Sequence, residues 1–143
     1  MKFFEGFIKV GEYCSKKYIG ITFQHCFRVA CYAIANPCIV NEGEKDIVFK
    51  LAMCLDLLED TDATIEEICG VVNMERKIVE DTLTMLTKNK EETYVEYIKR
   101  LRNSENKFAY IIKLADMKDH LMQKETLTEK LKEKYWEAMP YLL

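Results

Sequence analysis

The fold is decided by the stretch Leu51-Ala-Met-Cys-Leu-Asp-Leu-Leu-Glu-Asp-Thr-Asp-Ala-Thr64, in which an apolar run ends in a cluster of acids. Apolar residues at 47, 48, 51, 52, 55 and 58 keep helical spacing, which predicts a helix over residues 42–59. Asp56 lies beside its buried stripe, and Glu59 and Asp60 follow one turn later. Because a buried carboxylate is costly unless a cation or donor meets it, we interpret Asp56 as functional. Asp62 we interpret as a cap of the next helix.

Length and charge limit the classes of protein to consider. At 143 residues the chain is expected to form a single domain over 1–143 that buries about 68–70% of its unfolded surface, enough to form a pocket. Its apolar fraction of 49% and charged fraction of 31% are typical of a globular protein. A net charge of −3 argues against a nucleic-acid-binding face, although a local basic patch can still hold a phosphorylated small molecule.

The sequence shows neither a membrane-spanning run nor a secretory signal, and both observations bear on the expected location of the protein. No apolar run approaches the ~20 residues that cross a bilayer, and the start Met-Lys-Phe-Phe-Glu-Gly lacks the apolar core of a secretory signal. None of the six cysteines forms a Cys-x-x-Cys pair, and most have apolar neighbours. We therefore expect a cytoplasmic protein with no membrane partner, whose cysteines are reduced core thiols.

Helical periodicity recurs along the whole chain, which has only five glycines and two prolines, so we predict an all-α helical bundle. Gly20 and its β-branched neighbours predict an extended loop over residues 18–23. A Thr64-x-x-Glu67 capping box predicts a short helix that stops near Gly70. The remaining helices are predicted over residues 3–17, 24–36, 74–87, 93–102, 105–123 and 126–139. The last of these we expect to serve packing only.

Three segments carry a resemblance to a known family. Asp56-Leu-Leu-Glu59-Asp60-Thr61 resembles the His-Asp-x-x-Glu-Asp-Thr signature of the HD phosphohydrolase superfamily, in the branch of (p)ppGpp 3′-pyrophosphohydrolases and their small single-domain relatives. The segment His25-Cys-Phe-Arg28 resembles the family's first metal-ligand segment, although a histidine there can also merely cap or satisfy a loop. Lys113-Leu-Ala-Asp116 resembles the segment whose aspartate closes the metal site. The resemblance spans about residues 16–120 and implies a bundle of the HD type.

The resemblance also implies a chemistry. In the family a divalent ion, usually Mn²⁺, lowers the pKa of a bound water while a nearby carboxylate takes its proton. The metal ligands implied here are His25, Asp56 and Asp116, and the implied catalytic acids are Glu59 and Asp60. The substrate is then a purine nucleotide that carries a pyrophosphate. The residues implied near its phosphates are Lys16, Lys17, Arg28 and Lys113.

The chain departs from the family pattern at two positions. Leu55 stands where the motif histidine is expected, and leucine has no lone pair for a metal. Even losses outside the ligand set can weaken metal binding ~10–100-fold. Cys54 is a poor substitute because it points about 100° away around the helix. His120, which stands where small relatives have asparagine, lies one turn after Asp116 on the same face, so both can reach one ion.

Three interpretations remain open at this stage. His120 or a water replaces the missing ligand and the protein is a metal-dependent hydrolase, or the metal is lost and a nucleotide-binding or protein-binding pseudoenzyme remains. Alternatively, Leu55 is a change introduced into a protein that naturally has histidine there. The retained Glu59 and Asp60 favour the hydrolase, and Leu55 favours the pseudoenzyme. Every interpretation in which the nucleotide site is retained requires Asp56 and Asp116 to lie on the same side of the domain.

Overall fold

The computed structural model describes residues 2–143, with side chains from residue 6 onward, and this part of the chain is helical with no strands. The predicted all-α bundle is therefore confirmed. The helices are α1 (Lys2–Lys17), α2 (Gly20–Ile34), α3 (Glu42–Met53), α4 (Leu57–Asp60), α5 (Ile65–Val72), α6 (Arg76–Met85), α7 (Tyr94–Asn103), α8 (Lys107–Met122) and α9 (Glu129–Leu142).

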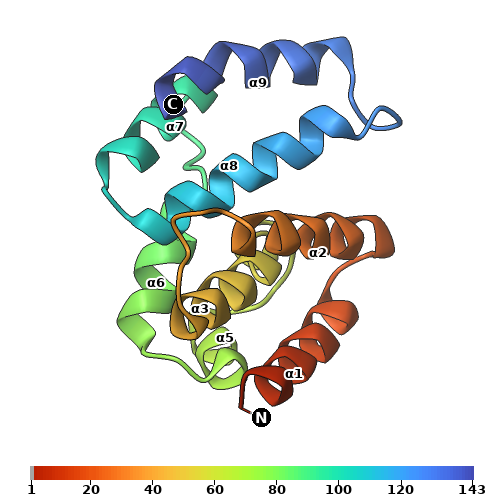
Figure 1. Cartoon of the computed structure of the whole chain (residues 1–143). Coiled ribbons are helices and arrows are strands. Elements are labelled where there is room, and N and C mark those ends of the chain that lie inside the picture. The colour runs from red at the N-terminus through yellow and green to blue at the C-terminus, as the bar shows by residue number, and fades with distance from the viewer. Residues whose placement is uncertain (1) are drawn as a thin grey trace.

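The core is built around α2, α3 and α8. Helix α2 packs against both α3 and α8, while α1 and α5 lie together at the N-terminal end and α7 and α9 cover the other side of α8 (Figure 1). Helix α3 is buried from Val48 to Met53, and half of the residues of α8 are buried. Helix α8 thus crosses the middle of the molecule, where Lys113, Asp116 and Asp119 have little access to water, whereas Lys107 and Lys118 are exposed.

The structure corrects the predicted start of the second helix. Residues 20–23 are helical, and only the junction around Ile19, with an extended backbone at φ −70° and ψ 159°, separates α2 from α1. The predicted loop over residues 18–23 is therefore wrong for most of its length. The β-branched residues there disfavour a helix only weakly, and the packing of α2 against α3 and α8 outweighs that preference. His25 consequently lies in the second turn of α2 instead of the first.

The structure also divides the helix predicted over residues 42–59. Helix α3 ends at Met53, and a turn that contains Asp56 leads into α4. The Tyr18 hydroxyl donates to the Met53 carbonyl at 2.9 Å and accepts from the Asp56 amide at 3.2 Å. Tyr18 therefore satisfies two backbone groups that the break frees in a buried place. The continuous helix is wrong because this partner comes from a distant part of the sequence.

Several local signals are confirmed by the structure. Thr64 caps α5 through the Glu67 amide, and α7 begins at Tyr94 directly after its cap Thr93, close to the predicted start at residue 93. All six cysteines are free thiols, and Cys14, Cys26 and Cys54 are buried. The expectation of core thiols is wrong for Cys38, which is exposed.

Among residues 2–143, no helix has both the length and the apolar character needed to cross a bilayer.

Candidate functional site

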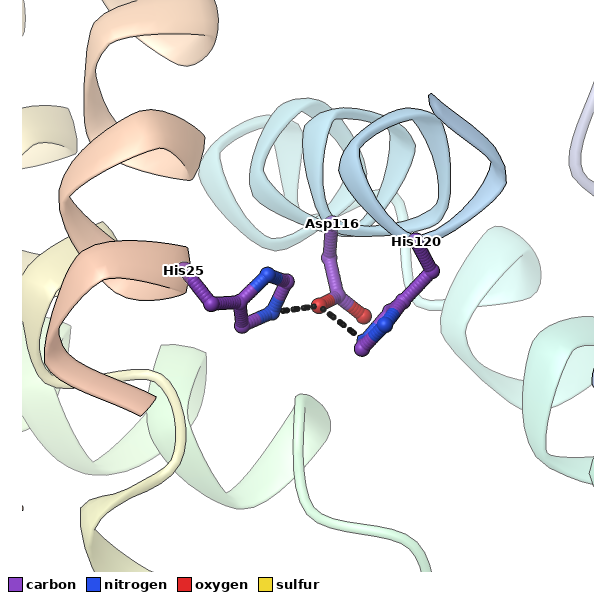
Figure 2. Close-up of side chains that lie close together, drawn as sticks. All are labelled: His25, Asp116 and His120. Atoms are coloured by element: carbon purple, nitrogen blue, oxygen red, sulfur yellow. Dashed lines mark hydrogen bonds and ion pairs between the residues drawn. The ribbon is translucent and has the colours of Figure 1, made fainter. Parts of the chain in front are cut away.

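Three side chains from two helices converge on one point. His25 reaches from α2 toward α8, where Asp116 and His120 project from one face one turn apart (Figure 2). Oδ1 of Asp116 lies 2.8 Å from Nε2 of His25 and 3.3 Å from Nε2 of His120. One ligand atom from each residue lies within 4.8 Å of the other two, which is close enough for all three to bind one metal ion.

The burial of this group differs from member to member. The side chains of His25 and Asp116 are 9% and 5% exposed, whereas that of His120 is 35% exposed. The His120 ring lies between the His25 ring, with centroids 4.3 Å apart, and the Tyr135 ring of α9, stacked at 5.1 Å and 11°. His120 therefore forms the solvent-facing side of the group, and Tyr135 supports it from α9.

A second carboxylate holds His25 from its other edge. Nδ1 of His25 lies 2.6 Å from Oδ2 of Asp119, whose carboxylate is fully buried. Arg28 donates to the same carboxylate from Nε at 2.7 Å and from Nη2 at 3.0 Å. Asp119 is thereby fixed by a two-pronged contact and in turn fixes the plane of the His25 ring, an arrangement typical of histidines that bind metals.

Lys113 neutralises the buried charge of Asp116. Its Nζ lies 2.7 Å from Oδ2 of Asp116, one turn away on α8, and the lysine side chain is 8% exposed. This contact leaves Oδ1 free to face the two histidines. A buried carboxylate is tolerated in a central helix because a cation of the same helix pairs with it.

The ionisation of the site follows from these contacts. Burial alone lowers the pKa of His25, but its hydrogen bonds and charge interactions with Asp116 and Asp119 outweigh burial and raise the pKa to about 9. Burial raises the pKa of Asp116, but Lys113 and the two histidines prevail and hold it well below its usual range. Without a metal, the protonated His25 ring therefore donates to both carboxylates.

Asp56 lies beside this group but outside it. Its Oδ2 is 3.9 Å from Nε2 of His25 and accepts a weak hydrogen bond from the Cys26 thiol at 3.6 Å. Burial and the nearby negative charge of Asp116 raise the pKa of Asp56 to about 6. Asp56 and Asp116 thus lie on the same side of the domain, as the proposed site requires.

A pocket of about 350 Å³ opens over these residues. It is bounded by α2, the turn that carries Asp56, the end of α8 and the segment that leads into α9. Its lining includes four acids but only one arginine, Arg28, whose guanidinium is already paired with Asp119. The residues that line it are Ile21, Thr22, Gln24, His25, Arg28, Asp56, Asp60, Asp119, His120, Gln123, Glu125, Thr126, Leu127 and Leu131.

Other residues singled out in the sequence lie away from the pocket lining. Glu59 is exposed and accepts from the Lys88 amide at 2.9 Å. Lys17 pairs with Asp62 at 2.9 Å, and Lys16 is exposed. Leu55 is 3% exposed and belongs to the hydrophobic core. The structure therefore brings together His25, Asp56, Asp116, His120, Asp60 and Arg28, but not Glu59, Lys16 or Lys17. Lys113 is buried against Asp116 and is not among the residues that line the pocket.

Sequence reasoning missed Asp119 and Tyr135. A signal for Asp119 was present, since Lys113, Asp116 and Asp119 recur every three residues and share one side of α8. No comparable signal exists for Tyr135, which lies in a helix predicted to serve packing only. Its role depends on how α9 folds back over α8.

Comparisons of the chain with models of known protein families, with curated proteins and with solved structures found no match.

Proposed function

We propose that this protein is a metal-dependent phosphohydrolase of the HD type that acts on a purine nucleotide bearing a pyrophosphate, (p)ppGpp or a relative. The observation that carries the proposal is the convergence of His25, Asp116 and His120 beside Asp56, at a pocket whose lining includes His25, His120 and Asp56. The motif resemblance supplies the substrate class. The support from the structure concerns the site. Residues that are far apart in the sequence, and that the motif resemblance expects to act together, lie close to one another.

The residues present fit a divalent metal ion. Two imidazole nitrogens and one carboxylate oxygen are donors that Mn²⁺, Fe²⁺ and Zn²⁺ accept, and three protein ligands leave positions open for water and substrate. We assign the ligands as His25, Asp116 and His120, so that His120 takes the place of the histidine missing at Leu55. A metal bound there lowers the pKa of its water and neutralises phosphate oxygens.

The surrounding residues have distinct tasks in this proposal. Asp119, held by Arg28, keeps the proton on Nδ1 of His25 and so leaves Nε2 free to bind. Asp56, whose pKa is raised to about 6, is suited to take a proton from water near neutral pH. Asp60 lines the same pocket, whereas Glu59 bonds to Lys88, so Asp60 is the better acid of that pair to meet the substrate.

The test is calorimetric titration of Mn²⁺ into the protein and three variants. We expect the parent to bind, and His120→Ala and Asp116→Ala to bind at least about 10-fold more weakly. Asp81→Ala, which changes an exposed acid on α6, is the control and should bind like the parent. Hydrolysis of (p)ppGpp is then assayed with the parent and His120→Ala. Equal binding by the parent and His120→Ala would contradict the ligand assignment.

A second candidate is a nucleotide-binding or protein-binding pseudoenzyme without a metal. It is favoured by Leu55, which supplies no ligand, and by the shortage of unpaired cations in the pocket lining. Leu55→His separates the two candidates. If only this variant binds Mn²⁺, the parent is a hydrolase relative that has lost its metal site. If the parent binds Mn²⁺ and this binding depends on His120, the pseudoenzyme without a metal is excluded.

A further inference from the structure

Helix α9 places a half-buried lysine without an acidic partner at the edge of the site. Lys134 has no carboxylate within ion-pairing distance among the residues whose side chains the structure describes. By contrast, the buried lysines Lys50 and Lys113 each pair with an aspartate of their own helix. An ammonium that loses water without gaining a counter-charge is unfavourable. Lys134 therefore differs from the buried lysines. Lys88 is also half-buried without an acidic partner, but its Nζ donates to the Asn89 carbonyl at 3.1 Å.

Two tyrosine rings hold Lys134 in place. Its Nζ lies 4.6 Å from the centroid of the Tyr94 ring and 4.8 Å from that of Tyr135. Tyr135 is also the ring stacked on His120, which connects Lys134 directly to the metal-ligand group. Leu131, one turn earlier on α9, lines the pocket. Lys134 does not itself line the pocket, but lies next to it on the α9 side.

A second ammonium lies against the same tyrosine. Nζ of Lys113 is 5.5 Å from the Tyr94 centroid, so two positive charges share one ring. Burial and the charge of Lys113 lower the pKa of Lys134. The nearby acids offer incomplete compensation, because Asp116 is already paired with Lys113 and Glu59 accepts from the Lys88 amide. Contacts with aromatic rings stabilise an ammonium only modestly, so they do not replace an anion.

We propose that Lys134 is an anion-binding residue that receives a phosphate or pyrophosphate group at the α9 side of the site. An incoming anion would neutralise the Lys134 ammonium, which is partly withdrawn from water. The Tyr94 and Tyr135 rings would keep the ammonium in position. The choice of phosphate as the anion rests on the proposed function. The binding of an anion by Lys134 does not require the metal, so the two proposals can fail separately.

The probe is inorganic pyrophosphate, titrated by calorimetry into the full chain with and without Mn²⁺. Lys134→Met removes the charge and keeps most of the packing, and Lys134→Arg restores the charge. Lys132→Met changes an exposed lysine on the same helix and serves as the matched control. A charge-assisted hydrogen bond is worth about 1.5–3 kcal/mol, so Lys134→Met should bind pyrophosphate about 10-fold or more weakly than the parent. Lys134→Arg should recover most of the loss, and Lys132→Met should match the parent.

The outcomes separate the anion site from the metal site. Equal affinities for Lys134→Met and Lys132→Met, or no pyrophosphate binding by the parent, would overturn the role of Lys134. Mn²⁺ titrated alone into Lys134→Met should bind as it does to the parent, since Lys134 is not a ligand. If the parent binds pyrophosphate through Lys134 but binds no Mn²⁺, the anion site stands and the metal-dependent hydrolase does not.

Discussion

Nδ1 of His25 lies 2.6 Å from Oδ2 of Asp119, although 94 positions separate the two residues. This contact ties α2 to α8 at the centre of the site, and Arg28 completes it from the next turn of α2. The ring of His25 cannot rotate without breaking the contact. The direction in which Nε2 points is therefore determined by a residue outside the proposed ligand set.

Replacing Asp119 should weaken metal binding without removing a ligand. Asp119→Asn keeps the shape but loses the charge that holds the His25 proton and the Arg28 guanidinium. We expect Mn²⁺ affinity to fall about 10-fold or more, the usual cost of losing such a partner. Calorimetry measures the affinity, circular dichroism checks the fold, and Asp81→Asn is the control. Parent-like affinity in a folded variant would show that Asp119 has no positioning role.

Removing the Tyr18 hydroxyl should destabilise the fold at the break between α3 and α4. Tyr18→Phe removes the partner of the Asp56 amide and leaves the Met53 carbonyl with only the weak hydrogen bond from the Cys14 thiol at 3.6 Å. A buried polar group left unsatisfied costs about 1–3 kcal/mol, and we expect a loss of that size in the free energy of unfolding by urea. Tyr110→Phe, at a half-buried tyrosine on α8, should cost clearly less. Equal losses in the two variants would rule out the bridging role.

The metal-free protein should lose stability as the pH rises, because of His25. Its pKa is about 9 in the folded protein against 6.5 ordinarily, so the folded state binds the proton more tightly. This contribution is fully present below about pH 6.5 and disappears as the pH passes about 9, and it amounts to about 3 kcal/mol at most.

The measurement compares the parent with His25→Gln by urea unfolding in the presence of a chelator. The parent should be the more stable protein at about pH 6, and the difference should shrink markedly by about pH 10. A difference that stays constant over this range would mean that His25 does not carry the raised pKa.

Two lysine-to-methionine changes should have very different costs. Lys113→Met leaves Oδ2 of Asp116 buried without its partner, and breaking a buried pair in this way costs about 3–5 kcal/mol. Lys107→Met breaks an equally short contact, 2.7 Å to Glu44, but at the surface, where such pairs contribute about 0–1 kcal/mol. Thermal or urea unfolding of both variants measures the contrast. Similar losses would mean that the buried pair contributes no more than the exposed one.

The sequence was informative wherever the signal is local. Helical spacing of apolar residues predicted the all-α fold, and the capping residue Thr64 marks a real helix start. Asp116 and His120 could be placed on one face because four residues make about one helical turn. These features depend on residues within one or two helical turns of each other, so they can be inferred from the sequence alone.

Tertiary structure alone decided the features that depend on distant partners. The end of α3 at Met53 requires the Tyr18 hydroxyl, and the support of His120 requires α9 to fold back so that Tyr135 stacks on it. The cations Lys17 and Lys113 are engaged by Asp62 and Asp116, which their residue types alone do not reveal. The sequence by itself determined the helical class of the fold and the spacing of residues along each helix, but not where α2 begins or where α3 ends. Packing determined which side chains meet across helices, because a buried charge or backbone group takes its partner from whatever segment the fold brings near.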